Sequence, residues 1–209
     1  MLAIYFFIAL SAAVAGSFWI DWLYKLPTAP LSFPEKIFSR GRFRKILLTI
    51  IFFAAIIFCA EMSTLQATRT LTAIFFLSLI IMTDFEQYVI FDKMLFPFAI
   101  LSLPFIVGLN FSLANHFSAA FFGGGIFFIL MIISKNGLGG GDVKLIFVLG
   151  LWLGVNGLIF VILSGAILAG ISALILLLTK IKNRQDVFAY GPYFCISAIG
   201  RLIFDFKFF

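Results

Sequence analysis

The chain has 209 residues, of which 63% are hydrophobic and 11% are charged, with 15 Lys and Arg against 9 Asp and Glu. So little charge cannot cover the surface of a water-soluble domain of this length, and 30 phenylalanines exclude a disordered chain. The two cysteines, Cys59 and Cys195, lie inside apolar runs, which excludes a disulfide scaffold.

Apolar runs along the chain predict an all-α, polytopic integral membrane protein, because a transmembrane helix needs about 20 mostly apolar residues. About eight spans emerge, at residues 1–23, 43–60, 68–83, 94–110, 117–133, 143–154, 157–179 and 190–206. The first run lacks the basic start and the cleavage site of a signal peptide, so we expect a retained helix. The expected partner is therefore the lipid bilayer. The excess of cations does not indicate nucleic acid, because no soluble core accompanies it.

The distribution of basic residues predicts the orientation of these spans. The segment after the first span carries six Lys and Arg against Glu35, so the positive-inside rule places it in the cytoplasm and the N-terminus outside. Alternation then places residues 84–93, 134–142 and 180–190 on the same inner side. With this topology, twelve of the 15 cations lie on the cytoplasmic side.

Two interpretations of residues 143–179 remain open: one very long helix, or two helices separated at Gly154-Val155-Asn156-Gly157. We favour two helices, because glycine and asparagine punctuate the run at that point. The sixth span then has about twelve residues, or about 18 Å of helix, which is shorter than the bilayer core. A helix this short leaves Asp142 below the inner membrane surface.

Two acidic residues, Asp84 and Asp142, stand apart from the others. Asp84 ends an apolar run, where the helix dipole disfavours an anion, and Asp142 follows Gly139–Gly141 at the start of the next run. Helix capping explains Asp142 but not three glycines, which let backbone approach a ligand or adopt positive φ values. Two converging carboxylates can share one proton and activate water, as in aspartic proteases. Acids inside membranes also serve as ion and proton sites, and this alternative stays open.

Two motifs resemble those of the type IV prepilin peptidases, the GxGD class of membrane aspartic proteases. Gly139–Leu145 resembles the GxGDxKL signature of that family. Asp84–Asp92, followed by Pro97, is similar to its first-aspartate segment. Further similarities lie at Gly16–Phe18, Tyr24–Pro27, Arg40–Arg42 and Tyr190–Tyr193. The similarities occur in the family's order and together span nearly the whole chain.

The resemblance implies a multi-pass endopeptidase of the bacterial cytoplasmic (inner) membrane that removes the basic leader from prepilins or pseudopilins. The resemblance also implies that Asp84 and Asp142 are the catalytic pair. The supporting or substrate-binding candidates are Gly139, Gly141, Lys144, Glu86 and Asp92. Lys144 is expected either to tune Asp142 or to be an ordinary interfacial cation. Glu86 and Asp92 are expected either to attract the basic leader or to be ordinary charged residues of a solvated loop.

The same resemblance divides the chain into residues 1–45, a first helix with a basic cytoplasmic loop, and residues 46–209, a helical membrane peptidase domain. Larger relatives carry two Cys-x-x-Cys pairs in that loop, suited to zinc, and also methylate the new N-terminus with S-adenosylmethionine. The loop between Pro27 and Arg40 has no cysteine. We therefore expect a peptidase without a metal or other cofactor, and the missing cysteines argue against N-methylation.

Other functions are weighed against this one. His116, the only histidine, is expected in an outer loop away from both aspartates, which disfavours a metalloprotease. The main alternative is a small multi-pass transporter or pilus-assembly scaffold that uses the same acids as ion or proton sites, although no convincing internal repeat is found. A second alternative is a GxGD protease that cuts other membrane helices.

Overall fold

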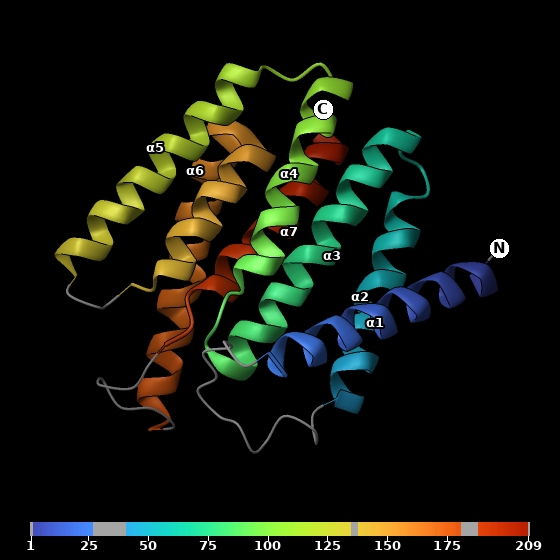
Figure 1. Cartoon of the computed structure of the whole chain (residues 1–209), viewed down its shortest axis with the longest axis horizontal. Coiled ribbons are helices and arrows are strands. Elements are labelled where there is room, and N and C mark those ends of the chain that lie inside the picture. The colour runs from blue at the N-terminus through green and yellow to red at the C-terminus, as the bar shows by residue number, and fades with distance from the viewer. Residues whose placement is uncertain (1, 27–40, 135–137, 181–187, 209) are drawn as a thin grey trace. The chain divides into compact units, whose positions relative to one another are not determined.

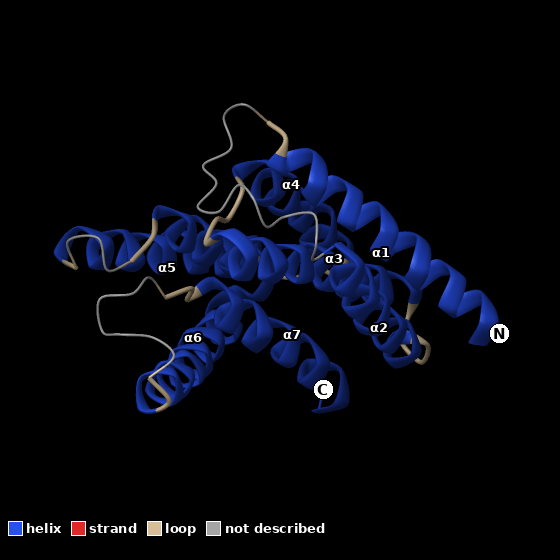
Figure 2. Ribbon diagram, turned by 90° about the horizontal axis from the view of Figure 1, so that it is seen from below, coloured by secondary structure: helices blue, strands red, loops and turns tan. Residues whose placement is uncertain are grey.

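The computed structural model describes residues 2–26, 41–134, 138–180 and 188–208, which form helices and short connections without any strand (Figures 1 and 2). The described helices are α1 (Leu2–Tyr24), α2 (Gly41–Cys59), α3 (Thr64–Gln87), α4 (Asp92–Gly108), α5 (Leu113–Ile133), α6 (Gly140–Leu178) and α7 (Gly191–Phe208). Each predicted span coincides with one of these helices or with part of one. The expected all-α class is therefore confirmed for the described residues.

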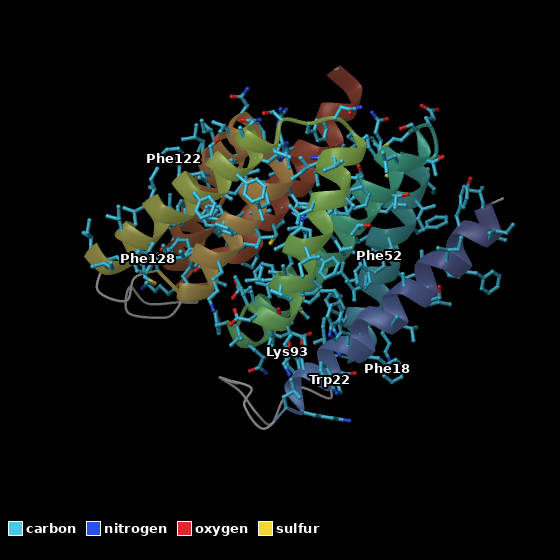
Figure 3. All side chains as sticks on the ribbon, turned by 45° about the horizontal axis from the view of Figure 1, so that its top comes forward. Phe18, Trp22, Phe52, Lys93, Phe122 and Phe128 are labelled. Atoms are coloured by element: carbon cyan, nitrogen blue, oxygen red, sulfur yellow. The ribbon has the colours of Figure 1, made fainter. Side chains whose placement is uncertain are left out.

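The outer surfaces of the helices are apolar. Four helices, α1, α3, α5 and α6, are long and apolar enough to cross a membrane. Large side chains lie on the outside, such as Phe18, 63% exposed, and Phe122, 73% exposed (Figure 3). Exposed apolar surface of this extent is unfavourable in water and fits contact with lipid. Of the six cations on which the orientation prediction rests, Lys36 and Arg40 lie in residues 27–40, which are outside the described residues.

The chain divides into two compact units, Met1–Phe91 and Asp92–Phe209. In the first unit, α1 packs through small residues that are spaced to lie on one side of the helix. Ala9, Ala13 and Gly16 are all buried, and a Cβ at Gly16 would lie 2.8 Å from Leu79 Cδ2 of α3. Small residues let membrane helices approach closely, so Gly16 lets α1 pack against α3 at this point. The separate division at residue 45 stays a prediction.

In the second unit, α4, α5 and α7 pack against α6. A Cβ at Gly150 would lie 2.5 Å from the backbone nitrogen of Ala120, so α5 and α6 touch backbone to backbone. On α4, the Phe98 carbonyl accepts a 2.8 Å hydrogen bond from the Trp152 indole, and the two rings stack at 4.8 Å. Trp152 is therefore a buried packing residue that joins α4 to α6.

The break predicted at Gly154-Val155-Asn156-Gly157 is confirmed as a sharp fold-back inside α6, at Gly154. Gly154 has φ 66° and ψ −176°, which is not helical and falls where glycine is favoured. A Cβ at Gly123 would lie 2.4 Å from Leu158 Cδ2 and 3.4 Å from Ile146 Cγ2. These two residues are twelve positions apart, or about 18 Å along a straight helix. Both meet Gly123 because α6 returns on itself at Gly154 (Figure 1).

Two side chains of α5 replace the backbone hydrogen bond that the break removes. In a continuous helix the Val155 N–H would donate to the Leu151 carbonyl. Instead, Asn115 Oδ1 accepts from the Val155 N–H at 3.3 Å, and His116 Nδ1 lies 2.8 Å from the Leu151 oxygen. Because a carbonyl only accepts, Nδ1 carries the proton.

The expectation that His116 lies in an outer loop is wrong. The residue belongs to α5, is 4% exposed and stacks on Phe111 at 5.5 Å. The helix begins earlier than the apolar run because Ser112 caps it by accepting from the Asn115 N–H.

Replacing His116 is expected to destabilise the second unit. The substitution His116→Ala leaves the Leu151 carbonyl unpaired at a buried position, a cost of about 1–3 kcal/mol. In His116→Asn, an amide nitrogen occupies the place of Nδ1, so part of this loss is recovered although the ring contact is gone. The measurement is the thermal unfolding midpoint in detergent micelles. Equal midpoints for the alanine and asparagine variants would contradict the role of the hydrogen bond.

Candidate active site

Asp142 lies at the third position of α6, where its carboxylate reaches back to the start of its own helix. Gly139 is the N-cap residue, with extended φ and ψ angles of −75° and 145°, and its backbone amide interacts with the Asp142 carboxylate. A residue three positions after the cap that bonds the cap amide forms half of a capping box. A Cβ at Gly139 would lie 3.2 Å from Asp142 Oδ2. Here glycine provides room for the carboxylate. Of the two alternatives given for Gly139–Gly141, close approach to a ligand or positive φ, the positive φ is not seen.

A second helix terminus faces the same carboxylate. The backbone amide of Gly191, the first residue of α7, also interacts with Asp142. Backbone amides at helix N-termini lack intrahelical partners and attract anions. Asp142 is 8% exposed, and its Oδ1 atom has no hydrogen-bond partner within the described part of the chain. The carboxylate is thus oriented by two helix starts and keeps one oxygen for a further contact.

Asp84 lies in the last turn of α3, as the sequence predicts. Asp84 is 5% exposed, and its carbonyl accepts a 2.9 Å hydrogen bond from the Tyr88 N–H, the last of the helix. The left-handed backbone of Tyr88 (φ 55°) then turns the chain out of α3. The neighbouring side chains Thr83 and Gln87 are also buried. Asp84 belongs to the first compact unit and Asp142 to the second. The convergence of the two carboxylates therefore stays a prediction.

Glu86 does not lie in a solvated loop but in a buried polar cluster of the first unit. Its Oε2 atom accepts hydrogen bonds from Arg44 Nη1 at 2.9 Å and from the Tyr24 hydroxyl at 3.0 Å. Its side chain is only 11% exposed. The carboxylate is engaged inside the protein, so its first role is to hold the end of α3 against α1 and α2.

Arg44 is the centre of this cluster and was missed as a structural residue, because its neighbours in sequence are loop cations. It is 0% exposed, pairs with Asp21 and Glu86, and donates from Nε to Ser17 Oγ at 3.1 Å. A buried guanidinium needs partners for its charge and its donors, and here α1 and α3 supply them. The signal in the sequence is an arginine at the start of α2, separated by one residue from the long apolar run that begins at Ile46.

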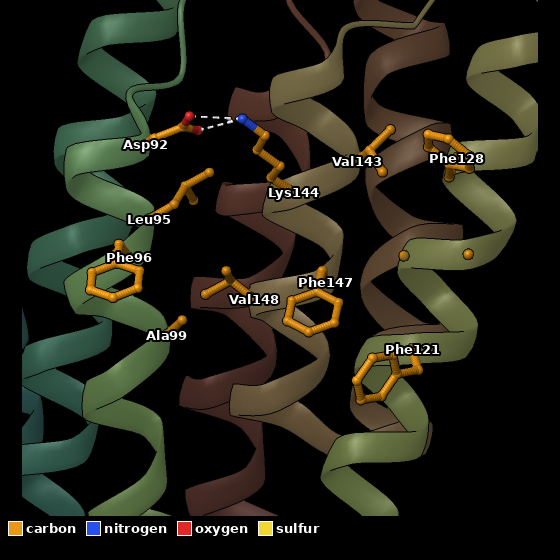
Figure 4. Close-up of a pocket in the computed structure, with 12 residues that line it drawn as sticks. Asp92, Leu95, Phe96, Ala99, Phe121, Phe128, Val143, Lys144, Phe147 and Val148 are labelled. Atoms are coloured by element: carbon orange, nitrogen blue, oxygen red, sulfur yellow. Dashed lines mark hydrogen bonds and ion pairs between the residues drawn. The ribbon is translucent and has the colours of Figure 1, made fainter.

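Lys144 contacts Asp92 and not Asp142 among the interactions seen. Its Nζ lies 2.7 Å and 2.8 Å from the two carboxylate oxygens of Asp92, which joins the first turns of α4 and α6 (Figure 4). The side chains are 57% and 69% exposed, and exposed ion pairs contribute only about 0–1 kcal/mol. This pair is weak enough to exchange partners.

No group of three His, Cys, Asp or Glu side chains gathers to hold a metal ion within the residues described. The expectation of a peptidase without a metal stays a prediction. Gly141, the remaining supporting candidate, lies in the first turn of α6 directly before Asp142.

Removing Arg44 is expected to destabilise the first unit. The substitution Arg44→Ala leaves Asp21 and Glu86 without their cation, and breaking a buried pair in this way costs about 3 kcal/mol. Lys45→Ala is the matched control, because Lys45 lies next in α2 and, within the described part of the chain, its side chain makes a cation–π contact with Phe18 at 5.3 Å, worth about 0.5–1 kcal/mol. Thermal unfolding in detergent compares the two. A midpoint for Arg44→Ala no lower than that of Lys45→Ala would refute the cluster's role.

Comparison with known proteins shows which family and which proteins this chain is similar to. Residues 71–174 match the type IV leader peptidase family. The chain is 33% identical over 73 residues to a prepilin leader peptidase/N-methyltransferase of Xanthomonas campestris pv. campestris, covering 35% of this chain and 25% of that protein. It is 34% identical over 74 residues to a protein of the same description from Neisseria gonorrhoeae, covering 35% of this chain and 24% of that protein.

The matched part of the chain corresponds to about a quarter of the length of each of these relatives. No solved structure matches the chain. The family match contains both Asp84 and Asp142, and with them the start of α6 and the end of α3. Residues 71–174 of this chain, close to half of its length, therefore belong to the type IV leader peptidase family.

Proposed function

We propose that this protein is a membrane aspartic endopeptidase that removes the basic leader from type IV prepilins or pseudopilins, with Asp84 and Asp142 as the catalytic pair. The observation that carries the proposal is the family match over residues 71–174, which contains both aspartates. The two relatives described as prepilin leader peptidases support the substrate class. The burial of both carboxylates supports the chemistry, because water-excluded acids can divide one proton between them.

In the proposed reaction, one carboxylate is ionised and the other is protonated. The ionised carboxylate takes a proton from a water molecule, which attacks the carbonyl carbon of the scissile peptide bond. The protonated carboxyl polarises the carbonyl oxygen. As the C–N bond of the tetrahedral intermediate breaks, the carboxyl that took the proton from water passes it to the leaving amine. The amides of Gly139 and Gly191 orient Asp142 and leave its Oδ1 for the water or the substrate.

The proposed topology has eight crossings with the N-terminus outside and both aspartates near the cytoplasmic face of the bacterial inner membrane. The fold-back of α6 supports this count, because its 39 residues would extend about 58 Å if straight, nearly twice the thickness of the bilayer core. Gly140 to Gly154 alone spans only about 22 Å. A first segment this short would keep Asp142 inside the membrane surface, partly shielded from water.

Replacing either aspartate tests the mechanism. Asp84→Asn and Asp142→Asn are each expected to lower the rate of leader cleavage by about 10⁴-fold or more, the scale of loss for an essential catalytic group. Glu61→Gln, the same change of chemistry in the exposed turn between α2 and α3, is the control and retains wild-type activity. The assay uses purified enzyme in proteoliposomes with a full-length prepilin, followed by gel shift and mass spectrometry. Wild-type processing by both aspartate variants would remove the catalytic assignment.

The chemistry of the product tests the second activity named in the relatives. Because the chain has no cysteines beyond Cys59 and Cys195, it cannot form the cysteine-based zinc site of methylating relatives. We expect the new N-terminus to be released unmethylated even with S-adenosylmethionine present. Mass measurement of the product decides this, and a product heavier by one methyl group would show that methylation needs no such site.

A further inference from the structure

A groove in the second unit is not used by the proposed chemistry. It has a volume of about 640 Å³ and lies between α4 and α5, with the first segment of α6 as its base (Figure 4). Its walls are apolar and largely aromatic, formed by Leu95, Phe96, Phe121, Phe128, Phe147 and Val148. Among the described residues that line it, Asp92 and Lys144 are the charged ones, and they pair at one end. The groove therefore has a charged end and an apolar body.

We propose that this groove receives the first two turns of the prepilin's apolar helix, with the basic leader directed to the Asp92–Lys144 end. The inference rests on the proposed function and adds to it a place where the substrate is held before cleavage.

The position of the groove along the chain favours this occupant. Val143 and Lys144 line the groove and directly follow Asp142, so the charged end lies within one turn of α6 from the candidate catalytic carboxylate. In the proposed substrate, the scissile bond joins the basic leader to the apolar helix. If the basic leader lies at the Asp92–Lys144 end and the apolar helix lies in the body of the groove, the scissile bond between them lies near the start of α6.

The size and charge of the groove match this order of substrate segments. From Asp92 to Ala99, α4 advances about 10 Å, which is about two turns of a helix lying alongside it. The apolar walls reject charged side chains, whereas a leader lysine or arginine can replace Lys144 as the partner of Asp92, because that ion pair is exposed and weak. The basic leader of the substrate thus matches the charged end of the groove, and the apolar helix that follows it matches the apolar body.

An open glycine on α5 favours a helix over a lipid chain. A Cβ at Gly125 would meet no atom within 4 Å, although Gly125 lines the groove. At the preceding Gly124, a Cβ would lie 3.2 Å from Phe147 Cβ, so that glycine is covered by α6. A glycine without covering side chains on a membrane helix permits the close approach of another helix. A flexible acyl chain can bind without such close backbone contact.

Filling the groove tests the proposal kinetically. Gly125→Leu places a side chain in open space, so no clash in the folded protein is expected. Gly170→Leu is the matched control, because a Cβ at Gly170 also meets nothing within 4 Å and this residue of the second α6 segment does not line the groove. We expect Gly125→Leu to raise the KM for full-length prepilin about tenfold, equivalent to about 1.4 kcal/mol, with little change in kcat. Gly170→Leu retains the wild-type KM.

Photo-crosslinking tests occupancy without catalysis. In the Asp142→Asn protein, a photo-reactive amino acid replaces Phe121 in the groove or Gly170 outside it, and the protein is mixed with full-length prepilin in proteoliposomes. The expected result is prepilin labelled from position 121 and not from position 170, with the label on its apolar helix.

Label on phospholipid alone, or a KM for Gly125→Leu equal to that of Gly170→Leu, would overturn the groove assignment even if the aspartate variants are inactive. Failure of the proposed function appears differently. In that case the wild-type protein cleaves no prepilin, whatever the groove binds.

Discussion

The second unit depends on one constraint, which is that a backbone surrounded by hydrocarbon must satisfy its own polar groups. At Gly154 the chain breaks this rule locally, since the helical hydrogen bond from Val155 to Leu151 is lost. Asn115 and His116 of α5 supply the missing acceptor and donor. The repaired break lets α6 fold back, so that both of its segments pack on α5 and its second segment leads to α7. The only histidine therefore has a structural task.

The same requirement accounts for the surroundings of Asp142. The amides that begin α6 and α7 have no partners within their helices, and the carboxylate of Asp142 faces one from each. The residue proposed to activate water is thus also the residue that joins two helix starts. Its position is determined by backbone groups, which side-chain substitution elsewhere does not remove. The carboxylate held in this way keeps one oxygen, Oδ1, without a hydrogen-bond partner among the described residues.

Glu86 and Asp92 differ in whether their carboxylates remain accessible to another molecule. Glu86 is held by Arg44 and Tyr24 inside the first unit, where it anchors the end of the helix that carries Asp84. Asp92 shares an exposed ion pair with Lys144 at the mouth of an apolar groove. A buried charge is costly to separate from its partner, whereas an exposed pair exchanges readily. This difference assigns Glu86 to the architecture and leaves Asp92 accessible to a basic segment.

The sequence by itself determined the positions of the helices, the break near residue 154 and the location of Asp84 and Asp142 at helix ends. These features follow from signals within a few residues: apolar runs, glycines and acids beside them. Only the tertiary structure decided the roles of Arg44, Glu86, His116 and Gly191. Their partners lie far away along the chain, 42 residues between Arg44 and Glu86 and 35 between His116 and Leu151. A hydrogen bond over such a separation depends on how helices pack, which local pattern does not encode.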